Sequence, residues 1–354
     1  MPRSESIAQL ESLVGQEKPI KLLTTLLRNG TIPHALLFTG IDGIGKRSAA
    51  VAFAMACNCL NPDSEQLFQD ERNFHTTNNR LNRTPPCGSC RSCRKIQSGS
   101  HPDIIIVEPS GQFIKIGQIR ALCHTLAMKP FEARCRVVII LDSQTMNPSA
   151  GNALLKLLEE PPDRTILILT ARQSSDLLPT IVSRCQHIRF NPIPRENMMT
   201  MLVEKKSAHP DDAAIIASMA NGSFSKALAI IDSRNRGNWI QHRKWLIGEV
   251  DALTSRPVGA LLAFAATLSK NKAILSESLE VMKSYLRDLI VCKYCPEKIT
   301  NMDLKSRIQS ASQSMTTAAL LAKIGDIQAA QKNIQANANV RLTLEVLVMR
   351  LAKV

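Results

Sequence analysis

A short glycine-rich stretch, GIDGIGKRS at residues 40–48, constrains the fold of this chain more than any other feature. It follows the apolar run HALLFT and sets Gly40, Gly43, Gly45 and Lys46 in the frame G-x-x-x-x-G-K. In such a loop, backbone N–H groups converge on a phosphate, the next helix N-terminus favours its charge, and the lysine reaches the outer phosphates. The stretch therefore predicts a strand, a phosphate-binding loop and a helix in that order.

The region from Leu36 to about Arg189 alternates short apolar runs with stretches of helical period. Runs that are apolar almost throughout are typical of parallel strands covered on both faces. Together with a phosphate loop after the first strand, this order predicts an α/β P-loop domain with a parallel sheet. The candidate strands are ALLFT (35–39), DIIIV (103–107), RVVIIL (136–141) and TILILT (165–170).

The magnesium ligands of an active P-loop enzyme are missing from their usual places. A hydroxyl after the lysine and an acidic residue ending a second strand normally hold the ion. Here Arg47 replaces the hydroxyl, and Asp142 stands alone after Leu141, from which it faces away if the pleat is regular. Ser48 supplies a hydroxyl only if the loop register slips. We expect a phosphate cradle with a degraded Mg2+ site, so ATP binding stays open and hydrolysis is not expected.

One helix within this domain can be delimited from its ends. Asn147 suits an N-cap, Pro148 suits the first helical position, and the pair Pro161-Pro162 must end the helix. The sequence therefore predicts a helix that carries NALLKLLEE.

The strand signal ends after the segment FNPIP (190–194). Residues 195–232 predict a few short helices with a break at Gly222-Ser223, and from about residue 237 the period is helical. Apolar residues spaced by four and three predict the core of a helix bundle. They are Leu275, Leu279, Met282, Leu286 and Leu289, and then Val340, Leu344, Leu347 and Leu351.

Three cysteines, Cys87, Cys90 and Cys93, follow one another at C-x-x-C spacing in PCGSCRSCRK. This spacing lets a tight turn direct thiolates at one ion, and tetrahedral Zn2+ needs a fourth ligand. We therefore predict a structural zinc site. The candidates for the fourth ligand are Cys57, Cys59, His75 and His101.

Charge and composition narrow the classes of partner. The 354 residues carry a formal net charge of +14, which points to nucleic acid or an acidic partner. Aromatic residues make up only 4%, which disfavours a protein that stacks single-stranded bases and leaves contact with a duplex backbone open. The start lacks the apolar stretch of a signal peptide, and no apolar run approaches the roughly 18 residues of a membrane span. We expect a cytoplasmic protein with reduced cysteines.

A single arginine offers a possible role in catalysis. The segment TIVSRCQHIRF sets Arg184 at a turn that we expect to follow a strand. An arginine held there could reach the nucleotide of a neighbouring subunit and stabilise charge on the γ-phosphate in trans.

Two longer stretches, NALLKLLEEPP and LLPTIVSRC, resemble the clamp-loader branch of the AAA+ ATPases. GSHPD (99–103) and CGSCRSC resemble the delta-prime family of bacterial DNA polymerase III subunits. The similarity runs from LVGQEKPIKLL (13–23) to NANVRLTLEVLVMRLA (337–352) and so covers essentially the whole chain.

The resemblance implies three parts: an AAA+ core at residues 1–190 with a zinc module inserted at 57–93, a helical lid at 191–235, and a helical collar at 236–354 that oligomerises. It also implies that the fourth zinc ligand comes from the helix after the phosphate loop. Cys59 matches that position better than Cys57. The polar segment from Asn61 to Pro86 is then an inserted loop.

The resemblance further implies a clamp-loader subunit that acts in DNA replication as a stator without hydrolysis of its own. Arg184 is then an arginine finger for the adjacent ATPase, Thr170 matches a sensor position, and Lys226 lies near a second one. The implied partners are the gamma/tau-type and delta-type subunits. The sliding clamp and primer-template DNA are reached through the complex, without a membrane.

Two other functions compete with this interpretation. The first is an active gamma/tau-type ATPase, against which Arg47 and Leu141 stand, because motor subunits keep a hydroxyl and an acidic pair there. The second is a zinc module that binds nucleic acid by itself. Low aromatic content and the few charges near the cysteines (Arg91, Arg94 and Lys95) disfavour it.

Overall fold

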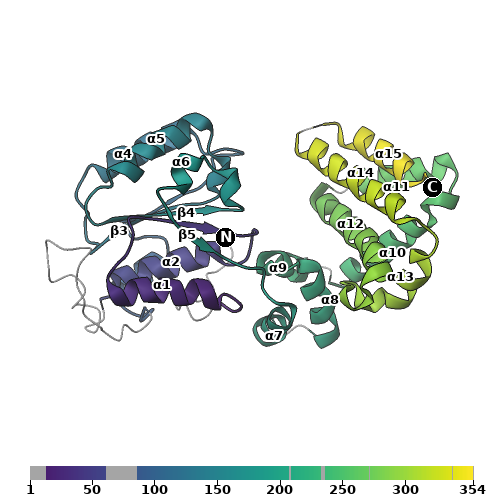
Figure 1. The fold of residues 1–354 in the computed structure, drawn as a ribbon, viewed down its shortest axis with the longest axis horizontal. Helices are drawn as coiled ribbons and strands as arrows, with labels where there is room; N and C mark the ends of the chain where they lie inside the picture. The colour runs from purple at the N-terminus through teal and green to yellow at the C-terminus, as the bar shows by residue number, and fades with distance from the viewer. Residues whose placement is uncertain are drawn as a thin grey trace. The chain divides into compact units, whose positions relative to one another are not determined.

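The computed structural model describes residues 13–60, 86–206, 209–232, 236–270, 272–336 and 338–353. They form two compact units, which Figure 1 draws in purple to teal and in green to yellow. The first unit comprises the chain up to Asn197 together with Gly222–Ser225, and the second comprises Met198–Asn221 and the chain from Lys226. The predicted insertion at 61–86 lies outside the described residues except for Pro86, and His75 lies outside them too.

A five-stranded parallel sheet with the order β2-β3-β4-β1-β5 forms the centre of the first unit. The four predicted strands are confirmed within a residue or two. The fifth was missed because its sequence, QHIR, buries only Ile188. The strands are β1 (Ala35–Thr39), β2 (Ile104–Val107), β3 (Arg136–Ile140), β4 (Thr165–Ala171) and β5 (Gln186–Arg189).

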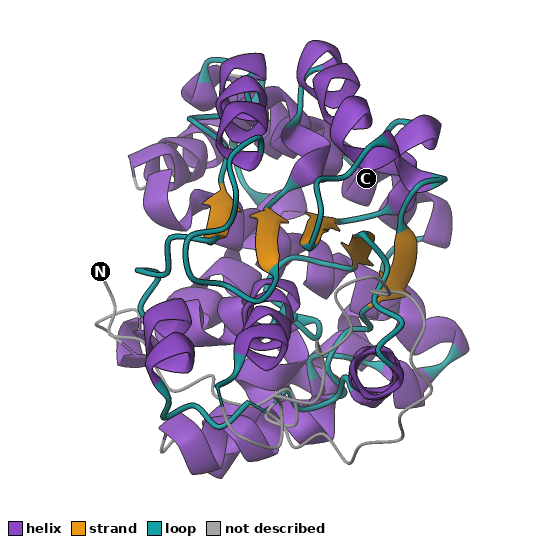
Figure 2. Cartoon of the chain, turned by 90° about the vertical axis from the view of Figure 1, so that its left-hand side faces the viewer, coloured by secondary structure: helices purple, strands orange, loops and turns teal. Residues whose placement is uncertain are grey.

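Helices cover both faces of this sheet, as Figure 2 shows with the strands in orange. Alternate residues of each strand point to opposite faces, so Leu36 and Phe38 of β1 pack with α1, α2 and α3, whereas Leu37 packs with α4, α5 and α6. This two-sided burial explains why β1, β3 and β4 are apolar almost throughout. The helices are α1 (Glu17–Asn29), α2 (Lys46–Asn58), α3 (Arg91–Gln97), α4 (Ile116–Leu126), α5 (Pro148–Glu159) and α6 (Pro179–Val182).

The ends of α5 follow the sequence prediction. The side chain of Asn147 accepts a hydrogen bond from the backbone N–H of Ala150 at 2.8 Å, and Pro148 occupies the first helical position. Proline lacks the N–H that would be unpaired there, and Pro161 cannot continue the helix. The helix therefore places Glu159 at its last turn.

Within its described residues, the second unit is helical. The two predicted apolar series lie in one core, where Leu279, Met282, Leu344 and Leu347 are buried. None of the described helices is both long and apolar enough to span a membrane. The helices here are α7 (Arg195–Lys206, which begins in the first unit), α8 (Pro210–Ala220), α9 (Phe224–Asp232), α10 (Arg236–Ala252), α11 (Val258–Lys270), α12 (Lys272–Tyr294), α13 (Lys305–Ser312), α14 (Thr317–Gln335) and α15 (Val340–Leu351).

An apolar surface remains on two packed helices of this unit. Leu342, Val346 and Met349 follow one another at positions i, i+4 and i+7 of α15 and are exposed by 60%, 46% and 37%. Val258 and Leu262 repeat the pattern on α11, which packs against α15. Side chains at this spacing share one helix face. We refer to these five residues as the collar surface.

Candidate nucleotide-binding and metal sites

The phosphate loop lies between β1 and α2, as the sequence predicted, and its backbone needs glycine. Gly40, Gly43 and Gly45 have φ angles of +144°, +77° and +101°, a region that other residues rarely adopt. The space around two of them is also closed. A Cβ atom on Gly40 would lie 2.7 Å from the carbonyl oxygen of Phe190, and one on Gly43 would lie 2.4 Å from Oγ of Ser223.

The loop lysine turns back onto the loop itself. Nζ of Lys46 donates to the carbonyl oxygen of Gly40 and, at 3.2 Å, to that of Ile41. The side chain is only 7% exposed. Burial lowers the pKa of Lys46 from its usual value, and Arg172 adds to this effect, while Asp42 and Asp142 oppose it. A phosphate in the loop would therefore have to draw the ammonium away from these carbonyl groups.

Arg47 is engaged with an acidic residue from another strand end. Its Nη1 lies 2.6 Å from Oε1 of Glu108, which follows β2. Sequence reasoning missed Glu108, because only the folded sheet brings this position to the start of α2. A guanidinium held by a carboxylate offers no oxygen ligand to Mg2+. Ser48, in the first turn of α2, is half-buried.

The end of β3 departs from the regular pleat that the sequence suggested. Asp142 has φ +49° and ψ +49°, so the chain turns left-handed directly after Leu141. Its backbone N–H donates to Oγ1 of Thr170 at 3.0 Å. This hydrogen bond joins the carboxyl ends of β3 and β4. Because the strands are parallel, the phosphate loop follows the carboxyl end of β1 on the same side of the sheet.

The environment of Arg184 corrects one prediction. The residue follows the short helix α6 and precedes β5, so it does not follow a strand. Pro179 at the first position of α6 starts the helix, and the apolar residues of TIV therefore belong to a turn of helix. Nη2 of Arg184 lies 2.8 Å from Oε1 of Glu159, and Nη1 donates to the carbonyl oxygen of Thr180 at 3.0 Å. The side chain remains 37% exposed.

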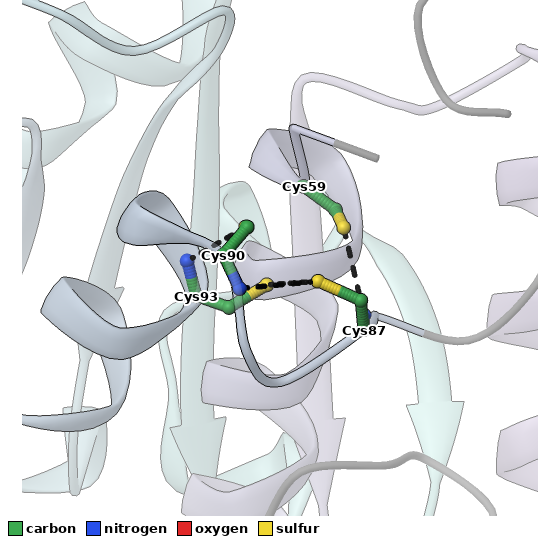
Figure 3. Close-up of side chains that lie close together, drawn as sticks. All are labelled: Cys59, Cys87, Cys90 and Cys93. Carbon is green, nitrogen blue, oxygen red and sulfur yellow. Dashed lines mark hydrogen bonds between the residues drawn. The ribbon is translucent and has the colours of Figure 1, made fainter. Parts of the chain in front are cut away.

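Four cysteines gather where α2 ends and α3 begins (Figure 3). The sulfur atoms of Cys59, Cys87, Cys90 and Cys93 all lie within 4.8 Å of one another. Cys59 caps the C-terminus of α2, and Cys90 caps the N-terminus of α3. Four thiolates around one Zn2+ at about 2.3 Å would lie roughly 3.8 Å apart, and Cys87 and Cys93 are 4.0 Å apart. The donor set therefore fits a tetrahedral zinc ion.

Backbone N–H groups support the negative charge that such ligands carry. Sγ of Cys87 accepts from the N–H of Cys90 at 3.3 Å, and Sγ of Cys90 accepts from that of Cys93 at 3.4 Å. Burial works to raise the pKa of the Cys87 thiol, but hydrogen bonds with Cys90, Ser89 and Cys59 outweigh it and lower the pKa to about 6. Hydrogen bonds to a thiolate favour its charged form.

Comparison with known proteins identifies the family of this chain. A family model described as "DNA polymerase III, delta subunit" matches residues 15–194, and one described as "DNA polymerase III, delta subunit, C terminal" matches residues 237–353. DNA polymerase III subunit delta' of Bacillus subtilis is 30% identical over 340 residues, which cover 95% of this chain and 96% of that protein. The chain belongs to the delta-prime family of DNA polymerase III subunits.

Two further proteins are also similar to this chain. Subunit tau of Bacillus subtilis is 33% identical over 229 residues, which are 63% of this chain and 37% of that protein. Among solved structures, a DNA polymerase III gamma subunit-related protein of Thermotoga maritima is 20% identical to this chain, with a TM-score of 0.43. The match covers 93% of this chain and 98% of that protein.

Of the other candidates for the fourth zinc ligand, the two that the structure describes, Cys57 and His101, lie outside the four-cysteine group. Cys57 is buried in α2 one residue before the end of the helix. Nδ1 of His101 accepts from the backbone N–H of Asp103 at 3.2 Å, and its Nε2 lies 3.9 Å from Oε1 of Glu132. Lys226, expected near a second sensor position, is in α9 within the second unit and stays a prediction.

The GSHPD motif of the delta-prime chain fixes a loop beside the cysteine cluster. The carboxylate of Asp103 accepts three backbone N–H bonds of 2.8 Å, from Phe131, Glu132 and Ala133. The carboxylate of Glu132 in turn accepts hydrogen bonds of 2.6 and 2.8 Å from Nζ of Lys95 in α3. The motif therefore connects the loop before β3 with the helix that carries Cys93.

Proposed function

We propose that this clamp-loader subunit is a stator of the bacterial DNA polymerase III complex: it hydrolyses no ATP and supplies Arg184 in trans to a neighbouring ATPase subunit. One observation carries the proposal. Arg184 follows α6 with its side chain 37% exposed and preorganised by Glu159 and Thr180, whereas the chain's own loop lysine is buried against loop carbonyl groups. Arg184, rather than the phosphate loop, is therefore suited to contact a neighbouring subunit.

The phosphate loop supports a site that binds phosphate without hydrolysing ATP. Gly40, Gly43 and Gly45 keep the backbone that a phosphate needs, and Lys46 is placed to reach one if it leaves the carbonyl groups. The pair Arg47–Glu108 takes the position of the missing hydroxyl, which disfavours an active gamma/tau-type ATPase. ATP binding without a competent Mg2+ site is therefore part of the proposal.

Zinc has a structural role in this proposal. Cys59, Cys87, Cys90 and Cys93 would hold the ion, and four thiolates leave no open position for catalysis. Bound zinc would supply a cross-link between the end of α2 and the start of α3. The rival function, a zinc module that binds nucleic acid by itself, gains no support from this helix-linking arrangement, in which Cys59 and Cys93 are buried.

The proposed partners are the gamma/tau-type and delta-type subunits, with the sliding clamp and primer-template DNA contacted in the assembled complex. The collar surface on α11 and α15 supports oligomerisation, because five exposed apolar side chains lie on two helices that pack together. The net charge of +14 favours sequence-independent contact with the DNA backbone. The division into core, lid and collar at residues 190 and 235, and the cytoplasm as location, belong to the same proposal.

The test is the turnover of ATP by the complex assembled with primer-template DNA. Arg184→Ala should lower ATP turnover at the neighbouring site that this arginine serves by at least about tenfold. The complex should still assemble. Arg189→Ala is the matched control, because Arg189 is an exposed arginine five residues further along the same segment. It should leave turnover unchanged.

Two results would contradict the stator. An unchanged rate for Arg184→Ala in a correctly assembled complex would exclude the role in trans. A loss for Lys46→Ala that matches the loss for Arg184→Ala would favour an active ATPase in this chain.

A further inference from the structure

Arg184 is held by two elements of the first unit at once. Glu159, the last residue of α5, contacts Nη2 at 2.8 Å, while Nη1 contacts the carbonyl oxygen of Thr180 at 3.0 Å and Oγ of Ser183 at 3.4 Å. These contacts use three of the five N–H groups that a guanidinium carries. The remaining donors stay available to a phosphate group.

The end of α5 suits a cation for a second reason. The C-terminus of a helix carries partial negative charge from its unpaired carbonyl groups. Glu159 adds a full charge at that end, and its carboxylate is 51% exposed. A long arginine side chain on the surface samples many rotamers, and two anchors from different helices reduce that number before a partner arrives.

We infer that Glu159 is a positioning residue for Arg184, an inference that rests on the proposed function of this arginine. The motif LEEPP ends α5 and the motif SRC follows α6, and the contact between Glu159 and Arg184 is where the two meet. Glu159 acts only through the guanidinium. It orients the donors and does not itself meet the nucleotide.

The sign of the effect separates positioning from competition. A carboxylate that merely competed with phosphate would hold the arginine back, and its removal would raise turnover. A carboxylate that positions the arginine loses orientation when it is removed, so kcat falls while KM for ATP stays the same.

The experiment is a double-mutant cycle in the assembled complex with primer-template DNA, scored on the turnover that Arg184→Ala removes. Glu159→Ala should lower this Arg184-dependent turnover about two- to fivefold, as expected for an exposed ion pair. Glu159→Gln keeps an oxygen acceptor and should lie between Glu159→Ala and the parent. Glu160→Ala is the matched control, an exposed neighbour that makes none of the contacts to Arg184, and it should leave turnover unchanged.

The cycle decides the inference. Combining Glu159→Ala with Arg184→Ala should give the turnover of Arg184→Ala alone. If Arg184→Ala lowers turnover but Glu159→Ala does not, or if the two losses multiply, the positioning role is wrong and the proposed function stands. If Arg184→Ala itself changes nothing, the proposed function fails and this inference fails with it.

Discussion

A single buried carboxylate, Asp103, shows how much of this molecule depends on individual residues. The side chain is 3% exposed and accepts three backbone N–H bonds from the loop before β3. Burial works to raise the pKa of Asp103, but these N–H groups and Arg136 outweigh it and hold the pKa below its ordinary value. The folded state therefore favours the charged form.

We expect the stability that Asp103 contributes to disappear in acid. Its pKa is lower in the folded chain than the ordinary value of about 3.9, so the unfolded chain takes up a proton first as the pH falls. The contribution is complete above that ordinary pKa and is lost as the pH drops through the folded value. Asp103→Asn should cost about 2 to 4 kcal/mol at neutral pH and flatten the acid part of the stability curve.

The measurement is urea unfolding from about pH 7 to about pH 3. Asp163→Asn is the control, because Asp163 is exposed on a turn before β4. An acid dependence of Asp103→Asn identical to that of the parent chain would contradict this account.

Residue types and spacing predicted much of the candidate sites. The frame of the phosphate loop and the spacing of three cysteines depend on neighbours in sequence, so both were visible there. The partners of the charged residues could not be predicted from the sequence. Glu108 meets Arg47, and Glu159 meets Arg184, only after the chain has folded, because each pair joins segments far apart in sequence.

At the scale of elements, burial on both faces decided what the sequence could reveal. β1, β3 and β4 are buried throughout and apolar almost throughout because helices cover both sides, and their prediction succeeded for that reason. β5 lies at the edge of the sheet with three of its four residues exposed, and the same criterion missed it. The strand that we expected before Arg184 is instead the short helix α6.

The seven-residue helix α3 is the element that most needs external support. Isolated helices of this length are marginal in water, and its N-cap is the side chain of Cys90. We expect about one zinc ion per chain in the purified protein, and Cys90→Ser should lose it and lower the melting temperature by roughly 5 °C.

Elemental mass spectrometry of the zinc content checks this prediction, together with thermal unfolding. Cys123→Ser, on α4 outside the cluster, should keep both the zinc and the melting temperature. A metal-free parent chain that folds and assembles normally would contradict the structural role of zinc.

At the scale of the whole molecule, we expect the second unit to offer a surface for assembly. The collar surface is exposed in the isolated chain although its five residues are apolar. Its helices were predictable from their period, but exposure was not, because buried and exposed apolar residues follow one another along α15.

We expect Val346→Asp to leave the chain folded, since Val346 is 46% exposed, and to block its entry into the complex. Burial of an unpaired carboxylate in an interface costs several kcal/mol, so assembly should weaken at least about a hundredfold. Size-exclusion chromatography with the gamma/tau-type and delta-type subunits measures this.

Met302→Asp puts the same charge on an exposed apolar residue outside α11 and α15 and should assemble normally. Normal assembly of Val346→Asp would exclude the collar surface as an interface.

The cysteine cluster also determines where the chain can be lengthened. The backbone nitrogen of Cys87 lies 3.5 Å from Sγ of Cys59, although the two residues are 28 positions apart in sequence. The two ends of the intervening segment are thus pinned together by the folded unit itself, whatever the length between them. Loop closure depends only weakly on length, at about 0.6 kcal/mol for each doubling. The stretch between these two cysteines is therefore a natural insertion point for a fluorescent or affinity domain.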